Sequence, residues 1–101
     1  MEGLKKHTLY VGLNDKNTKT QLISNPMAMD IVNNVCGDCS IQEITGYYTH
    51  DNGEKVKENT LKVELLFKED SQVLTYCADL KRLLNQESIA LNTEVINSRL
   101  V

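Results

Sequence analysis

Apolar and polar residues alternate along two stretches of the chain, residues 7–13 and residues 55–67. The longer stretch turns one set of side chains one way and a second set the opposite way: Leu61, Val63, Leu65 and Phe67 against Thr60, Lys62 and Glu64. Successive side chains of a β-strand point to opposite faces of its sheet, so a period of two is typical of a half-buried strand. The pattern therefore predicts two strands, each with a core face and a solvent face.

Apolar residues recur every three to four positions in residues 25–36, which is the spacing of one face of an α-helix. This face comprises Ala28, Ile31, Val32 and Val35. Asn25 followed by Pro26 is typical of a helix start, with Asn25 as the N-cap and Pro26 at the first helical position. Gly37 suits the position just after the last turn, where left-handed backbone is common.

A second helix is predicted from about residue 70 to residue 85, with Asp70 or Ser71 as its cap. Its apolar stripe comprises Val73, Tyr76, Cys77, Leu80, Leu83 and Leu84. The remaining residues, 88–100, are predicted to form a last strand. In that strand three side chains are placed to face the core, those of Ile89, Leu91 and Val95.

Residues 40–49 are rich in Ile, Thr and Tyr, which favours a strand. The turn that follows contains Asn52-Gly53, a pair typical of a tight hairpin, so this strand is expected to pair with residues 55–67. Residues 18–23 fit either a short extra strand or an irregular lead-in to the first helix. The resulting order, β-α-β-β-α-β, predicts an α+β, ferredoxin-like fold with a four-stranded antiparallel sheet and two helices on one face.

The chain has 101 residues, with 11 Lys and Arg against 14 Asp and Glu and a formal net charge of -3 at pH 7. This length fits a single domain covering residues 1–101. Broad nucleic-acid binding needs clustered basic residues, so we expect no direct nucleic-acid partner. No apolar run approaches the roughly 20 residues of a membrane helix, and the first residues form no apolar signal segment. We therefore expect a cytoplasmic protein with no membrane partner and no cofactor.

Cys36 and Cys39 form a CxxC pair, and Cys77 is the third cysteine. A redox dithiol favours a helix N-terminus, where the helix dipole lowers the thiol pKa. Here the pair falls where the first helix ends, and no second CxxC completes the four ligands of a structural zinc site. We expect a tight turn and no metal site here, and we keep a thiol switch or metal site at Cys36 and Cys39 as a third hypothesis.

The expected hairpin turn combines His50, Asp51 and Glu54, a base and carboxylates that an active site could use. Ordinary turn chemistry explains the same residues, and His7 is the only other histidine. The chain has no Gly-rich phosphate loop and no hydrolase motif. We therefore assign no catalytic residue.

Tyrosines are expected on the sheet face that the helices leave open. Tyr10 is out of phase with its apolar neighbours, and one of Tyr47 and Tyr48 must point the same way because adjacent strand residues alternate. Lys62 and Glu64 share that face. RNA stacking is disfavoured, because the third strand lacks a basic, Gly-flanked aromatic motif. Tyrosines are enriched at protein interfaces, so the face is either a binding surface or simply solvent-exposed.

Four segments, residues 8–13 (TLYVGL), 44–48 (ITGYY), 51–54 (DNGE) and 62–66 (KVELL), resemble small uncharacterised bacterial proteins carried on plasmids, phages and conjugative elements. The layout is also similar to ferredoxin-like domains of unknown function. The resemblance covers roughly a third of the chain, and its motifs are structural. It implies a ferredoxin-like fold and an accessory gene of a mobile element. Such genes often encode compact acidic proteins that inhibit host defence machinery, such as anti-CRISPR proteins.

Two function classes follow from these observations. The first is a small acidic, non-enzymatic protein-binding module, in its specific form a mobile-element-encoded inhibitor of a host defence nuclease. Its contact surface would be the open sheet face or the acidic hairpin tip, which comprises Asp51, Glu54 and Glu58. The alternative is a dimeric ferredoxin-like small-ligand-binding domain or enzyme, with His7, Tyr10 or His50 as its polar groups. We expect the first class, with a protein partner or a second copy as a homodimer, and no enzyme activity.

Overall fold

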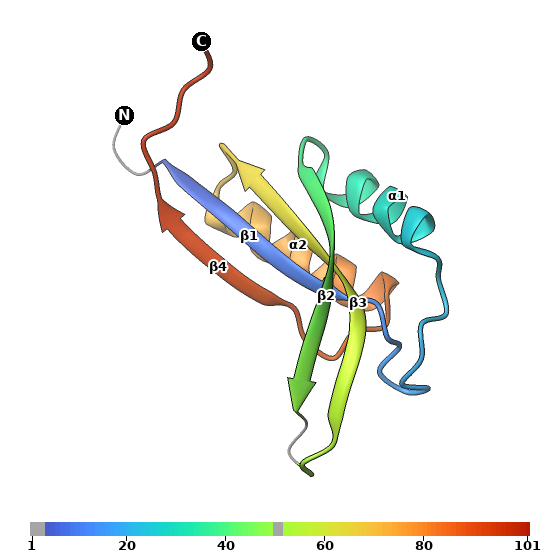
Figure 1. Cartoon of the computed structure of the whole chain (residues 1–101). Coiled ribbons are helices and arrows are strands. Elements are labelled where there is room, and N and C mark those ends of the chain that lie inside the picture. The colour runs from blue at the N-terminus through green and yellow to red at the C-terminus, as the bar shows by residue number, and fades with distance from the viewer. Residues whose placement is uncertain (1–3, 50–51) are drawn as a thin grey trace.

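The computed structural model describes residues 4–49 and 52–101, and its elements follow the predicted order. The strands are β1 (Lys5–Gly12), β2 (Ser40–Thr49), β3 (Lys55–Leu66) and β4 (Ala90–Val95), and the helices are α1 (Asn25–Cys36) and α2 (Asp70–Leu83). The strands form one antiparallel sheet in the order β2-β3-β1-β4, and both helices cover the same face of it (Figure 1). The predicted ferredoxin-like α+β fold is confirmed.

The core lies between this sheet face and the two helices. Its completely buried side chains come from both central strands and both helices: Leu9, Val11, Leu61, Val63, Leu65, Ala28, Val32, Val73 and Leu80. The β3 members are those that the alternation predicted. Burial of apolar area, at about 25 cal/mol per Å², is the main favourable contribution to this packing. Neither described helix combines the length and the apolar character that crossing a membrane requires.

Strand pairing decides which tyrosine lies on the open face with Tyr10. Residues directly opposite each other in an antiparallel ladder share a face, and Tyr10 pairs with Lys62 while Tyr48 pairs with Val56. Lys62 and Val56 are in phase on β3, so Tyr48 joins Tyr10 on the open face. Tyr47 points the other way, and it is 73% exposed because the hairpin extends beyond the helices (Figure 1).

The start of α1 differs from the prediction by one residue. Ser24 is the N-cap: its Oγ accepts a hydrogen bond from the Met27 backbone N–H at 3.3 Å, and Asn25 is already helical. The predicted end is confirmed, because Gly37 follows the last turn with a φ of 68° and its N–H donates to the Asn33 carbonyl at 2.9 Å. Serine and asparagine cap about equally well, so the tertiary path of the preceding loop chose between them.

The start of α2 also differs. Glu69 is the N-cap, whereas the sequence favoured Asp70 or Ser71. The Glu69 backbone N–H donates to the side-chain Oε1 of Gln72 at 3.0 Å, which is half of a capping box. The helix ends at Leu83 and so stops short of the predicted end near residue 85.

Two predicted strands were too long. β3 ends at Leu66 because Phe67 has a φ of 61°, which turns its ring out of the core and leaves it 47% exposed. β4 covers Ala90–Val95 only, and Val95, predicted to face the core, is 77% exposed. β4 is an edge strand and all six of its residues are exposed, so its side chains alternate without enough cover to bury Val95.

Candidate functional site

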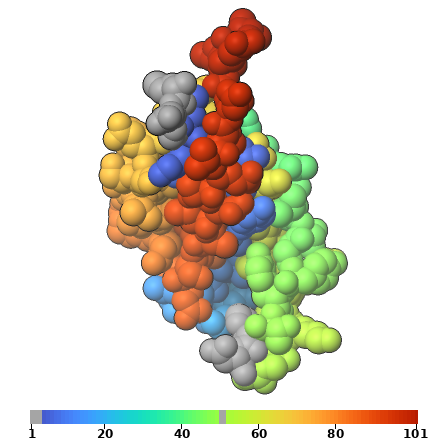
Figure 2. Space-filling view, turned by 90° about the vertical axis from the view of Figure 1, so that its left-hand side faces the viewer, coloured from blue at the N-terminus to red at the C-terminus, as the bar shows by residue number. Residues whose placement is uncertain are grey.

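A cleft of about 820 Å³ lies on the open face of the sheet, at the end where the hairpin begins. Its floor comes from β1 and β3, one wall from the β2–β3 hairpin, and the others from residues 14–19 and 86–90. Figure 2 shows β1 in blue at the bottom of the hollow, between β4 in red and the hairpin in green. The cleft is therefore built from segments that are distant in the sequence.

The carboxylate of Glu58 lies on the floor of the cleft and is half-buried. Its Oε2 accepts a hydrogen bond from the backbone N–H of Asn14 at 2.9 Å. Gly12, on the neighbouring strand, carries no side chain and leaves room for this carboxylate. A fixed, partly desolvated negative charge is thus presented to whatever occupies the cleft.

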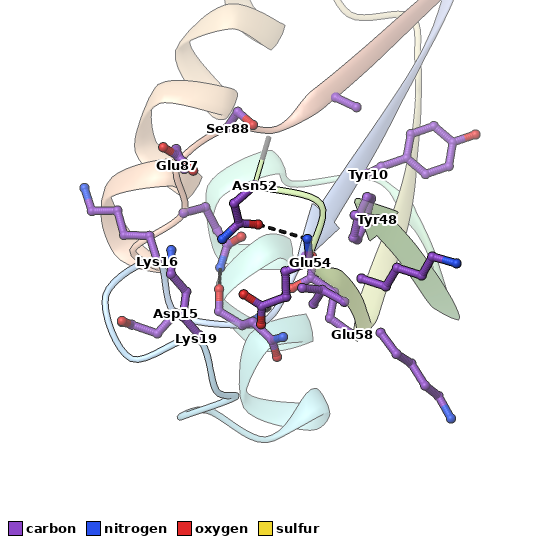
Figure 3. A pocket seen from close by; sticks show the side chains of 17 residues that line it. Tyr10, Asp15, Lys16, Lys19, Tyr48, Asn52, Glu54, Glu58, Glu87 and Ser88 are labelled. Atoms are coloured by element: carbon purple, nitrogen blue, oxygen red, sulfur yellow. Dashed lines mark hydrogen bonds between the residues drawn. The ribbon is translucent and has the colours of Figure 1, made fainter. Parts of the chain in front are cut away.

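Tyr48 and Tyr10 lie on the same side of the cleft (Figure 3). The Tyr48 hydroxyl is 3.3 Å from the Thr60 Oγ1, which is buried in the sheet, while the side chain of Tyr48 is 42% exposed overall. The Tyr48 ring is therefore anchored at its polar end and leaves aromatic surface free. Such rings can stack on the flat face of a base or hold a cation.

The wall opposite the tyrosines is a loop held by Asp15. Its Oδ1 accepts from the backbone N–H groups of Asn17 and Thr18, at 2.8 and 2.9 Å, and its Oδ2 accepts from the Asn85 side chain at 2.7 Å. These hydrogen bonds, that from Asn85 first, hold the pKa of Asp15 below its usual range. The side chain of Gln86 donates to the Asn14 carbonyl at 2.7 Å, so the loop is tied to the end of α2. Residues 18–23 form no strand here, and a single bridge joins Asn14 to Gln21.

Charged residues of both signs border the cleft. The acidic residues are Asp15, Glu54, Glu58 and Glu87, and the basic residues are Lys16, Lys19, Lys55 and Lys57. Lys57 is directly opposite Tyr47 and Lys55 is in phase with it, so these two side chains point to the other face of the sheet. The side chains on the cleft side are therefore mainly acidic, which suits a ligand with a cationic group and does not favour a polyphosphate, which needs an excess of basic groups.

Of the seven predicted binding residues that the structure describes, four lie together at the cleft. Tyr10, Tyr48, Glu54 and Glu58 line the cleft, and they come from three strands and the hairpin turn. Lys62 and Glu64 lie on the open face outside the cleft, 3.7 Å apart as a surface ion pair, and Tyr47 points to the other face. Asp51 and His50 fall outside the described residues.

His7 does not line the cleft, although it was one of the three polar groups, with Tyr10 and His50, expected for a ligand site. Its ring is 1% exposed and packs on the helix side of the sheet. Its Nδ1 is 3.0 Å from the Thr93 Oγ1, and its Nε2 is 3.4 Å from the Asp70 carboxylate. The Lys5 ammonium donates to the same carboxylate at 2.6 Å and lowers the pKa of Asp70. His7 therefore joins β1, β4 and α2 in a structural contact.

The three cysteines gather around the end of α1 and pack against the core, with Cys36 buried and Cys39 and Cys77 half-buried. Burial raises the pKa of all three thiols, that of Cys36 to about 12. A high thiol pKa opposes nucleophilic redox chemistry, since the thiolate is the reactive form. Within residues 4–49 and 52–101, no group of three or more His, Cys, Asp or Glu is arranged to hold a metal ion.

Cys36 is expected to resist alkylation by iodoacetamide at pH 8. With a pKa of about 12 only about one thiol in ten thousand is ionised at that pH, and the side chain is 1% exposed. Peptide mass spectrometry over a time course measures the labelling of each cysteine, and Cys39 serves as the internal control that reacts first. In denaturing urea all three should label alike. Fast labelling of native Cys36 would show that the end of α1 opens, and would revive the thiol-switch hypothesis.

The loop residues of the cleft were not found from the sequence. Asn14, Asp15, Gln86 and Glu87 were assigned no binding role from the sequence, and Ser88 was placed at the start of the last strand. One signal was available: Asn, Asp and Gln cluster in both loops, and such side chains bridge backbone groups. Their pairing across 70 positions or more could not be deduced from local pattern.

Comparisons with known proteins establish the fold class. No protein-family model matches the chain, and no curated protein gives a significant match. Among solved structures, a phage SAM lyase in complex with S-methyl-5'-thioadenosine is similar over 94% of this chain and 83% of its own, with a TM-score of 0.71 and 20% identity. CutA from Synechococcus elongatus (TM-score 0.55, 13% identity, 95% and 80% covered) and the B. subtilis GlnK–ATP complex (0.54, 14%, 95% and 84%) are also similar. The chain thus shares the ferredoxin-like fold of these proteins.

These similarities correct the expected function class. We expected a non-enzymatic protein-binding module, with a nuclease inhibitor as its specific form. The similarity to a phage SAM lyase, an enzyme, extends over most of the chain and contradicts that expectation. It favours the alternative, a ferredoxin-like small-ligand-binding domain or enzyme. The error arose because acidic charge and small size were interpreted through genomic type, whereas the cleft is visible only after folding.

Proposed function

We propose that this protein is an enzyme that binds an adenosyl sulfonium compound, of the S-adenosylmethionine type, in the cleft beside the β2–β3 hairpin. The observation that carries the proposal is the half-buried Glu58 carboxylate, fixed on the cleft floor and flanked by tyrosines. The fold similarity to a SAM lyase bound to S-methyl-5'-thioadenosine supports the same ligand class.

The charges of the cleft favour a ligand of the S-adenosylmethionine type over ATP, the ligand named for the similar GlnK structure. S-Adenosylmethionine carries a sulfonium, an ammonium and a carboxylate, whereas ATP carries only negative charge beyond its base. Four acidic residues border the cleft, whereas two of its four lysines, Lys55 and Lys57, point to the other face of the sheet, and the acidic Glu58 is held on the cleft floor. A polyphosphate would meet this carboxylate at short range, so a ligand with a cationic group is favoured.

The aromatic residues of the cleft suit the other end of such a ligand. Adenine offers a flat face, and the anchored ring of Tyr48 and the neighbouring ring of Tyr10 provide surface for stacking. Stacking of a base on an aromatic side chain contributes about 1–3 kcal/mol. We therefore orient the ligand with its adenosine on the two tyrosine rings and its amino-acid part toward Glu58. This orientation uses both the aromatic surface and the fixed carboxylate.

Cleavage of the sulfonium gives S-methyl-5'-thioadenosine when the bond between sulfur and the γ-carbon breaks and its electron pair goes to sulfur. The substrate's own carboxylate can attack that carbon, which closes a lactone ring and needs no external base. This route fits a cleft whose described lining contains neither histidine nor cysteine.

The role of Glu58 follows from the change in charge. The sulfonium loses its positive charge as the bond breaks, so a carboxylate against sulfur would stabilise the ground state more than the transition state. We therefore place Glu58 at the substrate ammonium. Held there, the amino-acid part is oriented with its carboxylate toward the γ-carbon.

The test is a direct assay of the purified protein with S-adenosylmethionine. Liquid chromatography with mass spectrometry should show S-methyl-5'-thioadenosine formed above the spontaneous rate, and calorimetry should show that this product binds while ATP does not. ATP binding with no turnover would favour a nucleotide-binding role of the kind named for GlnK, and binding of neither compound would refute the proposal.

Self-association and origin remain part of the proposal. No other described strand pairs with the outer edge of β4, and this strand exposes Leu91 and Val95, which favours contact with a second copy. Light scattering during the binding experiment measures the mass, and a monomer throughout would refute this part.

The phage source of the similar lyase supports the expected mobile-element origin. Three free cysteines support the expected cytoplasmic location.

A further inference from the structure

Two glycines sit on the open face of the sheet on either side of β3. Gly12 of β1 lies opposite Thr60, and Gly46 of β2 lies opposite Glu58. Neither glycine has a positive φ, so the backbone at both positions is strand-like and any residue could adopt it. Glycine in the interior of a strand weakens it and often marks a place that something approaches closely. The absence of a side chain, and not backbone freedom, is therefore what these positions provide.

Each glycine leaves a notch that a polar group fills. A Cβ at residue 12 would lie 2.7 Å from the Cδ of Glu58, and a Cβ at residue 46 would lie 2.5 Å from the Tyr48 hydroxyl and 2.7 Å from the Thr60 Oγ1. Contacts between carbon and these atoms normally exceed 3 Å. A methyl group at either position would thus displace the group that now occupies the notch.

We propose that Gly12 and Gly46 are positioning residues for ligand binding, Gly12 for the Glu58 carboxylate and Gly46 for the Tyr48 hydroxyl. The inference rests on the proposed function, since it concerns the same cleft. Gly12 lets the carboxylate lie against the floor, where it meets the Asn14 N–H at 2.9 Å. Gly46 lets the Tyr48 hydroxyl reach the Thr60 Oγ1 at 3.3 Å. Both groups are the ends of flexible side chains, so alanine should move them. Gly46→Ala also meets the Oγ1 of the buried Thr60, so we expect it to lower the stability more than Gly12→Ala does.

Double-mutant cycles test this assignment. Gly12→Ala is expected to weaken binding of S-methyl-5'-thioadenosine about tenfold by calorimetry, and to have little further effect in a Glu58→Ala background, where no carboxylate remains to be displaced. Gly46→Ala should show a similar dependence on Tyr48→Ala, which removes both the hydroxyl and the ring carbon Cζ that the new Cβ would meet at 2.5 and 2.8 Å. The matched control pairs Gly12→Ala with Tyr48→Phe, and these two changes should combine additively.

A readout without ligand separates this inference from the proposed function. The Asn14 amide resonance reports its hydrogen bond to Glu58, so Gly12→Ala and Glu58→Ala should shift it in the same direction, while Gly46→Ala should not. Thermal unfolding of each variant checks that the fold persists. If the wild-type protein binds no S-methyl-5'-thioadenosine, the proposed function fails and the amide shifts still decide the positioning. An unmoved Asn14 amide in Gly12→Ala, or an equal loss of affinity with and without Glu58, overturns the inference.

Discussion

Glu58→Gln is expected to lower kcat/KM for S-adenosylmethionine about 30-fold or more. The substitution keeps the size of the side chain and removes its charge, and a hydrogen bond between charged groups contributes about 2 kcal/mol or more in a partly desolvated site. The half-buried carboxylate already accepts the Asn14 N–H, so it enters the ligand complex without further ordering. Steady-state assays that follow formation of S-methyl-5'-thioadenosine measure the loss.

Glu64→Gln is the matched control. Glu64 lies on the same strand and the same open face, but outside the cleft, and its partner is the half-buried Lys62 at 3.7 Å. A surface ion pair of this kind contributes little, so this variant should keep nearly all of the activity. Equal losses in the two variants would mean that the general charge of the sheet face, and not the fixed carboxylate of Glu58, binds the substrate.

Leu9→Ala is expected to destabilise the protein by about 2–5 kcal/mol. Leu9 lies on the central strand β1, is 0% exposed and faces the helices, so its loss leaves a cavity that rigid neighbours on both sides cannot fill. For a domain of this length that is a large part of the whole free energy of unfolding, which is about 5–15 kcal/mol in small proteins. Urea denaturation followed by circular dichroism measures the change.

Leu91→Ala provides the comparison within the same register pair. Leu91 is directly opposite Leu9 on the edge strand β4 and points to the same side, but it is 38% exposed. Its truncation should cost clearly less than that of Leu9, about 1 kcal/mol or so. A larger effect at Leu91 than at Leu9 would show that the edge of β4 is covered in solution, as self-association would require.

The alternation of apolar residues was sufficient to predict the sheet core. Leu61, Val63 and Leu65 of β3 are completely buried, as their period of two indicated, because a strand exposes alternate side chains to opposite faces wherever it lies. The same rule failed at Phe67 and Val95. Both follow the apolar pattern, but the backbone turns at Phe67, and Val95 ends the edge strand β4, whose residues are all exposed. Local periodicity predicts the face of the sheet to which a side chain points. It does not predict whether another element packs against that face and buries the side chain.

The candidate site depended much more on tertiary structure. Tyr10 could be assigned to the open face from its phase alone, but the choice between Tyr47 and Tyr48 required the pairing with β3. Glu58 was taken for part of an acidic tip, and the structure shows it on the floor of the cleft because Gly12 lies beside it and Asn14 donates to it. These contacts join residues more than 40 positions apart.

By itself the sequence determined the order of the elements, the ferredoxin-like fold, and the core face of each central strand. Hydrophobic periodicity and turn residues act over a few positions, and the printed chain displays them directly. Only the tertiary structure decided where the cleft lies and which charges share it. Its walls are tied by hydrogen bonds such as that from Asn85 to Asp15 and that from Gln86 to the Asn14 carbonyl. Such bonds form between whichever polar groups the packed sheet and helices bring together, and no local pattern specifies their partners.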